Sequence, residues 1–223
     1  GKEESMPMGY AINNNYSGYL NNLSINKFLP PLNREIVYFG LAEYGHKGSL
    51  KRMSATSDFA EYQFDAIYND GSGIEDRFKV QYNIDYIRGT VTEKVLSNTR
   101  DNKKEVNSKL QPLVILKTPF TEGNSWSHKV GVDGKDYNVS AVIKEVDDKK
   151  GQLVVEYRVK DVPGYFENTY IEERTFEMER GMIGFKNLLP GDIGIDKSQA
   201  KDSKLLEEAI INHMFGYGTA STK

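Results

Sequence analysis

The sequence predicts a mainly β fold, an antiparallel and strongly curved sheet or partly closed barrel of about ten strands followed by a C-terminal α-helix. Three observations support this prediction. Residues 74–86 alternate apolar and polar side chains, which fits a long antiparallel strand with one packed and one hydrated face. Asp133-Gly134 separates two alternating runs, and this dipeptide strongly favours a β-hairpin. Only residues 203–215 show apolar side chains at a helical spacing.

Domain boundaries follow from where the pattern begins. Residues 1–33 are rich in asparagine and show no sustained period, so we expect an irregular N-terminal arm or spacer. Residues 34–223 then form a single β-rich domain with its helix at 203–215. A shift of about 79 positions keeps several strands in phase, so two β repeats within this domain are an alternative. Strands match in phase half the time, so the shift alone does not decide between these readings.

The chain is organised around residues 112–146, where strand and turn signals follow one another and which contain its only tryptophan. Trp126 precedes the Asp133-Gly134 turn, and we expect it to anchor the core near the start of a hairpin. After the turn, alternate residues share one face of the next strand: Tyr137, Val139, Ala141 and Ile143.

Composition excludes several classes of function. The net charge is −3 with both signs interspersed, which argues against nucleic acid as a partner. The chain has no cysteine, so thiolate catalysis, cysteine-ligated metals and disulfides within it are excluded. No apolar run reaches the ~18–20 residues that cross a bilayer. We interpret Gly1 as what remains after a leader was removed, and expect peripheral membrane attachment only through a removed N-terminal lipid anchor.

The sequence offers no catalytic motif, no cofactor motif and no metal site. The three histidines are far apart, and none forms a pair with the spacing of zinc ligands. Two acidic loops, at residues 70–76 and 192–196, lack the full ligand pattern of a calcium loop and are better read as turns. We therefore predict no catalytic residues, no cofactor and no bound metal.

One strand mixes charge with large apolar side chains on a single face: Tyr170, Glu172, Arg174, Phe176 and Met178. If this face points inward, the Glu/Arg pair must be compensated by hydrogen bonds. If it lines a concavity, it can hold a polar ligand. Asp76 poses the same question on its own apolar face, and Tyr82 lies further along that face. The candidate binding residues are Tyr170, Glu172, Arg174, Asp76 and Tyr82.

A family resemblance rests on residues 115–126, ILKTPFTEGNSW, and on two later stretches, Tyr170–Arg174 and Glu179–Phe185. With these residues the chain resembles uncharacterised exported lipoproteins and cell-wall-associated proteins of clostridia and related Firmicutes. The group usually carries a second Gly-x-x-Trp element, which residues 45–50 lack. The resemblance implies a β fold, export and a Gram-positive source, and transfers no catalytic residue.

Together these observations predict a non-catalytic, surface-anchored lipoprotein domain, extracellular and at the cell surface, with a binding or structural role. Its partner is an unidentified small molecule, glycan or protein. The alternative is an exported hydrolase that uses paired carboxylates on cell-wall or host polymers. We also expect the C-terminal helix to dock on an open edge or end of the sheet, because its apolar stripe would otherwise be exposed.

Overall fold

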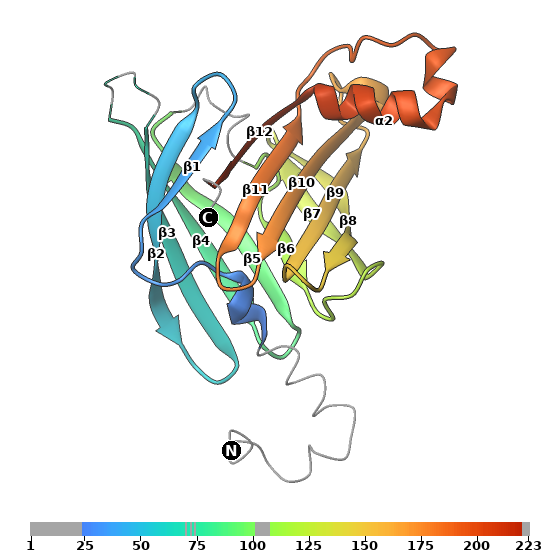
Figure 1. Cartoon of the computed structure of the whole chain (residues 1–223). Coiled ribbons are helices and arrows are strands. Elements are labelled where there is room, and N and C mark those ends of the chain that lie inside the picture. The colour runs from blue at the N-terminus through green and yellow to red at the C-terminus, as the bar shows by residue number, and fades with distance from the viewer. Residues whose placement is uncertain (1–23, 70, 72, 74, 101–107, 220–223) are drawn as a thin grey trace, which may run out of the picture.

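A computed structural model describes residues 24–69, 71, 73, 75–100 and 108–219. Twelve strands form one antiparallel sheet that curls into a nearly closed barrel (Figure 1). The predicted fold class is therefore confirmed. The strands are β1 (Ile36–Gly40), β2 (Gly45–Ala55), β3 (Phe59–Tyr68), β4 (Arg77–Asp85), β5 (Thr90–Asn98), β6 (Leu113–Lys117), β7 (Ser125–Val132), β8 (Lys135–Asp147), β9 (Gln152–Lys160), β10 (Thr169–Glu177), β11 (Gly181–Leu188) and β12 (Met214–Thr219).

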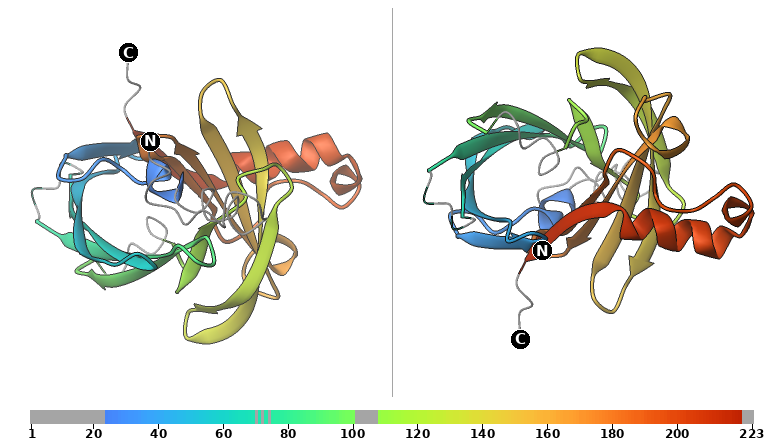
Figure 2. Two further views of the ribbon diagram at one scale, coloured as in Figure 1. Left: turned by 90° about the horizontal axis from the view of Figure 1, so that it is seen from below. Right: turned by 90° about the horizontal axis from the view of Figure 1, so that it is seen from above.

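The strand order is that of a meander closed by its own ends. Strands β1 to β6 lie side by side in sequence order, and so do β7 to β12. The ladder between β1 and β12 joins these two halves, and it leaves β6 and β7 as the edges of the sheet. Seen along the barrel, β1–β5 curl tightly whereas β8–β10 form a flatter wall (Figure 2).

Period-two alternation places the core where the sequence predicted it. In β8, Val139, Ala141 and Ile143 are buried, and the Asp133-Gly134 turn before them has the positive φ angles of 50° and 82° that a type I′ hairpin requires. A 79-residue shift aligns strand residues such as Tyr62 with Ala141 and Phe78 with Tyr157, and all four are buried. A meander without an internal repeat would bury them as well. The two-repeat architecture stays a prediction.

Residues 24–33 differ from the predicted spacer. Ser24–Phe28 form the 3₁₀-helix η3, which lies in the lower opening of the barrel (Figures 1 and 2). Ile25 is completely buried, and the Phe28 ring packs edge-on against Phe120 at 4.9 Å between centroids. Pro30, just after this helix, packs against Gly181 of β11 so closely that a Cβ added to Gly181 would lie 2.6 Å from the proline ring. The apolar residues of this short segment carry no period, so pattern alone missed their burial. Residues 1–23 lie outside the described residues.

The C-terminal helix is shorter than predicted. Helix α2 spans Ser203–Asn212, and the carboxylate of Asp202 caps its start by accepting hydrogen bonds from the backbone N–H groups of Lys204 and Leu205. The helix ends at Asn212, and the chain becomes β12 from Met214 onward. The pairing of β12 with both β1 and β11 overrides the helical pattern of the last residues.

Helix α2 also lies elsewhere than predicted. It runs over the outer face of β8–β11 rather than closing the barrel core (Figures 1 and 2). Leu206 and Ile210 are half-buried and line a groove with outward-facing residues of those strands, among them Glu173. The helix is therefore docked, but the element that occupies an end of the barrel is η3. No helix of the described residues has the length and apolar character needed to cross a membrane.

The edges β6 and β7 are joined mainly by side chains. One backbone bridge pairs Gln111 with Gly131. Beyond it, the Trp126 indole donates from Nε1 to the carbonyl oxygen of Val114 at 2.9 Å, and the Val114 N–H donates to Nε2 of His128 at 3.1 Å. We call this junction the β6–β7 seam. Trp126 is half-buried and packs against the core, so it anchors the seam rather than the centre of the core.

Candidate luminal binding site

Strand β10 lies between β9 and β11, and it carries two of the charged residues of the lumen, Glu172 and Arg174. Its alternation directs Tyr170, Glu172, Arg174 and Phe176 inward, each 2% exposed or less. Met178 was predicted to share this face, but it lies beyond the end of β10 and is 39% exposed. The inward orientation of a Glu/Arg pair makes hydrogen-bonding partners essential.

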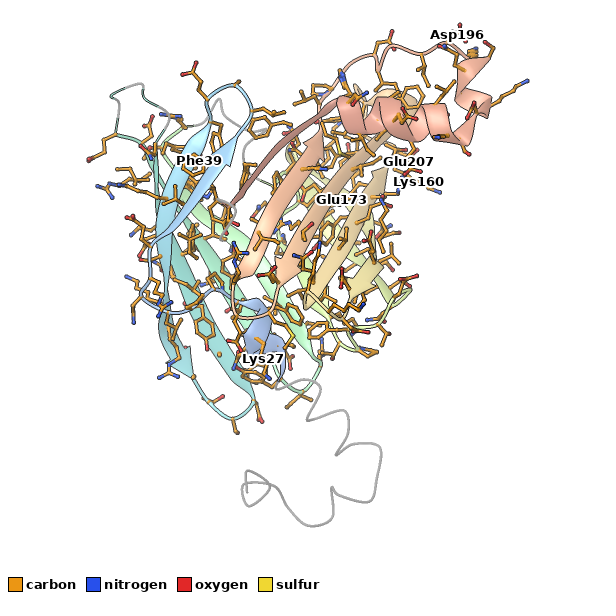
Figure 3. The ribbon with its side chains drawn as sticks, in the orientation of Figure 1. Lys27, Phe39, Lys160, Glu173, Asp196 and Glu207 are labelled. Carbon is orange, nitrogen blue, oxygen red and sulfur yellow. The ribbon has the colours of Figure 1, made fainter. Side chains whose placement is uncertain are left out.

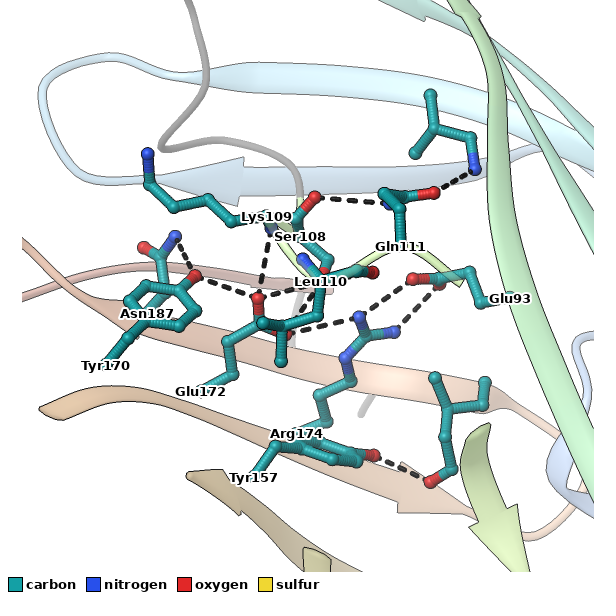
Figure 4. A network of polar contacts seen from close by, with 12 residues as sticks. Glu93, Ser108, Lys109, Leu110, Gln111, Tyr157, Tyr170, Glu172, Arg174 and Asn187 are labelled. Carbon is teal, nitrogen blue, oxygen red and sulfur yellow. Dashed lines mark hydrogen bonds and ion pairs between the residues drawn. The ribbon is translucent and has the colours of Figure 1, made fainter. Parts of the chain in front are cut away.

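Arg174 finds its main partner across the lumen. Its two terminal nitrogens donate to the two carboxylate oxygens of Glu93 on β5, each at 2.8 Å (Figure 4). This bidentate geometry is the strongest that a guanidinium and a carboxylate form. Burial alone would lower the pKa of Arg174, but the carboxylates of Glu93 and Glu172 raise it well above its usual range. Arg174 is therefore a permanent positive charge inside the barrel.

Glu172 is surrounded by donors. It accepts hydrogen bonds from the hydroxyl of Ser108 at 2.7 Å, the hydroxyl of Tyr170 at 2.8 Å and the backbone N–H of Lys109 at 3.2 Å (Figure 4). Arg174 contributes a longer contact of 3.4 Å. Burial raises the pKa of Glu172, and Arg174 and these hydrogen bonds oppose that rise. Burial and the neighbouring charge and donors thus act on the pKa of Glu172 in opposite directions.

Two buried side-chain atoms in this network lack a hydrogen-bond partner among the described residues, Nε of Arg174 and Oδ1 of Asn187. Asn187 donates through its other atom, Nδ2, to the hydroxyl of Tyr170 at 3.1 Å. The guanidinium also lies against the rings of Phe185 and Tyr157, at 5.4 Å and 5.6 Å from their centroids. Unpartnered buried polar atoms are uncommon in folded proteins and are often found where a water or ligand binds.

A cavity of about 60 Å³ adjoins the pair of Arg174 and Glu93. That volume holds roughly four water molecules. The hydroxyl of Tyr82 lines the cavity and donates to Glu93 at 2.9 Å. Phe28 and Pro30 of the η3 region also line it, so the segment in the lower opening borders the cavity directly.

The opposite wall of the cavity is an aromatic cluster centred on His46 of β2. The imidazole lies 4.6 Å from the ring of Tyr38 and 5.1 Å from the rings of Phe78 and Tyr217, measured between centroids. Nδ1 of His46 hydrogen-bonds the Tyr44 hydroxyl. Burial lowers the pKa of His46 to about 3, so the imidazole is neutral over the physiological range.

Four of the five predicted binding residues meet at this site. Tyr170, Glu172, Arg174 and Tyr82 belong to one network through Glu93. Asp76 does not join them. Its carboxylate pairs with Arg100 at 2.7 Å, in the β3–β4 region of the barrel. Asp76 precedes β4, where the alternation that assigned it to the inner face does not yet apply.

Sequence reasoning missed several residues that complete the site. Glu93 was detectable, because Val91 and Val95 place it on the apolar face of its strand, the same signal that identified Glu172 and Arg174. His46 follows a glycine in a strand of weak alternation, and Ser108 adjoins a polar loop. Neither position carries a signal in sequence, because only the curl of the sheet brings them to the lumen.

The arrangement is suited to holding a ligand rather than to attacking one. Both carboxylates are bonded to Arg174, and Glu172 is fully buried. Among the described residues, no three His, Asp or Glu side chains are grouped so that they could hold a metal ion. In the loop at 192–196, Asp192 and Asp196 accept hydrogen bonds from nearby backbone N–H groups, as turn residues do. Three residues of the 70–76 loop lie outside the described ones.

Comparison with known proteins gives no relative. No protein-family model, no curated protein and no solved structure matches the chain.

Proposed function

We propose that this chain is a non-catalytic binding module that holds a small molecule in the lumen of its barrel. The observation that carries the proposal is the cavity between the Arg174–Glu93 pair and the aromatic cluster around His46. Ligand sites typically combine mostly apolar walls with a few well-placed polar groups, and this cavity has both. A glycan or protein partner is favoured less, because the polar groups lie inside the barrel and are almost fully buried.

Filling the cavity tests this proposal. Val95 lines the cavity, whereas its neighbour Leu96 is 44% exposed. Val95→Phe places a ring in the lumen, and Leu96→Phe serves as the matched control with the same ring on the outer surface. The wild-type chain and Leu96→Phe are screened against a small-molecule library by thermal shift. We expect some compounds to raise the melting temperature of the wild-type chain and of Leu96→Phe. The same compounds should leave the melting temperature of Val95→Phe unchanged. Equal stabilisation of Val95→Phe would place the ligand outside the lumen.

A second candidate function, exported hydrolase, is favoured by one observation. Burial raises the pKa of Glu172, as expected for a general acid, and Glu93 is a second carboxylate nearby. Glycosidases, however, direct both carboxylates at the substrate across an open cleft. Here Arg174 bonds both of them. Hydrolysis of chromogenic glycosides or cell-wall fragments, abolished by Glu172→Gln in a chain that still folds, would establish this alternative.

We also propose that the protein is exported and anchored at the surface of a Gram-positive cell by an N-terminal lipid. Support comes from the resemblance of residues 115–126, 170–174 and 179–185 to exported lipoproteins of Firmicutes. Labelling cells that express the full-length gene with a radioactive fatty acid tests this proposal. Incorporation of label into the protein is expected, and a fully soluble, unlabelled protein in the medium would contradict it.

A further inference from the structure

We infer that the luminal ligand is an uncharged, largely apolar molecule that presents a hydrogen-bond acceptor oxygen, such as a carbonyl group. This inference rests on the luminal binding proposed above and narrows its ligand to one chemical class. It follows from an imbalance between donors and acceptors in the cavity wall and from the net charge of the buried ion cluster.

Three cavity-lining residues retain donors. Arg174 keeps the N–H at Nε without an acceptor among the residues that the structure describes. The hydroxyl of Tyr217 has no hydrogen-bond partner among the described residues, whereas that of Tyr38 beside it donates to the carbonyl oxygen of Met182 at 2.6 Å. His46 contributes the third donor. Nδ1 of His46 hydrogen-bonds the Tyr44 hydroxyl, and in the tautomer in which Tyr44 donates, Nε2 carries the imidazole hydrogen.

Acceptors are scarce by comparison. The carboxylate of Glu93 is the charged acceptor of the cavity wall, and it already receives two hydrogen bonds from Arg174 and one from Tyr82. A carboxylate offers about four acceptor positions, so little capacity remains. A ligand that accepts hydrogen bonds therefore satisfies all three donors. A ligand that only donates can bond the Tyr217 oxygen but offers nothing to the N–H groups of Arg174 and His46.

The net charge of the site disfavours an anion, and the positions of its charged groups disfavour a cation. Arg174 contributes one positive charge, and Glu93 and Glu172 contribute two negative charges when ionised, giving −1, or zero when Glu172 is protonated. An anion thus finds no excess of positive charge. A cation would have to approach the guanidinium of Arg174 and would find Glu93 largely occupied. An uncharged acceptor meets neither penalty, and the surrounding rings of Phe64, Phe78 and Phe185 suit an apolar remainder.

Three small probes of nearly equal size separate the classes: propionamide, propionate and propylammonium. Each is titrated into the ¹⁵N-labelled full chain, and the side-chain N–H signals of Arg174 (Nε) and His46 (Nε2) are followed by NMR. We expect propionamide to shift both signals downfield in a saturable manner, because a new acceptor lengthens and polarises the N–H bonds. Propionate and propylammonium should bind at least several-fold more weakly.

A matched pair of variants tests the donors. Tyr217→Phe removes the unpartnered hydroxyl, whereas Tyr38→Phe removes a hydroxyl that is already bonded to Met182. Both rings line the cavity and both changes delete one oxygen atom. We expect Tyr217→Phe to weaken propionamide binding several-fold and Tyr38→Phe to leave it unchanged, after each variant is shown to fold by its amide spectrum.

The outcomes distinguish the two levels of the argument. Tighter luminal binding of propionate or propylammonium, or equal effects of the two tyrosine variants, would overturn the ligand class while leaving luminal binding in place. If none of the three probes shifts a luminal signal, and the compounds found by thermal shift also bind Val95→Phe, the luminal site itself is refuted.

Discussion

The two halves of the barrel meet at two junctions that are built differently. Between β1 and β12 the chain forms a backbone ladder that pairs Tyr38 with Thr219 and Gly40 with Tyr217. At the β6–β7 seam there is a single backbone bridge, and side chains of β7 bond the backbone of Val114 instead. A ladder is made by any residues that fit its spacing, whereas the seam depends on particular side chains. The two junctions therefore differ in their sensitivity to substitution.

The β1–β12 ladder depends on a close approach of the two backbones at Gly40. A Cβ on Gly40 would lie 2.8 Å from the carbonyl oxygen of Gly216 and 2.9 Å from Cβ of Tyr217, so a larger residue would force β1 and β12 apart. The seam has bulky residues where the ladder has glycine. Tyr157 supports it from within by donating its hydroxyl to the carbonyl oxygen of Ile115 at 2.6 Å. The pair Arg174–Glu93 forms a third connection between the halves, across the lumen.

The largest effect is expected at this third connection. Arg174→Met should lower the free energy of unfolding by about 3–5 kcal/mol, because it leaves two buried carboxylates without their counter-ion. Arg158→Met is the matched control on the outer face of β9, where Arg158 pairs with Glu156 and is about half exposed. It should cost only about 0–1 kcal/mol. Urea unfolding measures both, and similar losses would show that the luminal pair is no more important than a surface pair.

Acid should act on the junction of β1 and β12, where His46 packs against Tyr38 and Tyr217. Burial lowers the pKa of His46 to about 3, below the value near 6.5 of an unfolded histidine. Stability from the neutral imidazole is thus complete above pH ~6.5 and is lost as pH falls towards 3. Two pH units of this window correspond to about 3 kcal/mol.

His46→Phe isolates that contribution, because phenylalanine keeps a ring in the cluster but cannot titrate. The difference in unfolding free energy between wild type and His46→Phe should shift by about 3 kcal/mol in favour of the variant between pH ~6.5 and pH ~4.5. Glu172 acts in the opposite direction, since its raised pKa favours the folded state at low pH, and it is common to both chains. Parallel pH profiles for the two chains would contradict the assignment to His46.

The seam should respond to the loss of Trp126. Trp126→Ala should cost about 2–3 kcal/mol, somewhat less than the ~3–5 kcal/mol of a fully buried tryptophan, because the indole is half-buried. Trp126→Phe keeps most of the ring but removes the donor to Val114, and should cost about 1 kcal/mol. Denaturant unfolding gives both values. Faster hydrogen exchange at Val114 in each variant would localise the effect, and unchanged stability of Trp126→Ala would place the indole in a different role.

The smallest effect is expected on the outer face of the ladder. Phe39 is 56% exposed and pairs with Gly218 (Figure 3). Phe39→Ser should change the unfolding free energy by no more than about 0.5 kcal/mol, because the backbone bonds of the ladder remain. Thermal and urea unfolding test this. A loss as large as that of Trp126→Ala would show that side chains, and not only backbone hydrogen bonds, hold β1 to β12.

Local pattern was sufficient for much of the β structure. The alternation in residues 137–143 and 170–176 identified which side chains face inward, and the Asp133-Gly134 dipeptide located a hairpin. These features depend on neighbours in the chain, so they are legible without a structure. The same logic singled out Glu172 and Arg174 as charges on an apolar face, and it would have found Glu93 as well.

The tertiary structure decided what long-range pairing controls. Met214–Thr219 has a helical pattern nearby but becomes β12, because β1 and β11 offer two ladders to one strand. Ile25, Phe28 and Leu29 are buried because their segment lies in the lower opening of the barrel. The partners Arg174 and Glu93 stand 81 positions apart in the chain, and Asp76 proved to belong with Arg100 instead. Periodicity indicates the face of a strand, but which faces meet across the lumen depends on the curvature of the whole sheet.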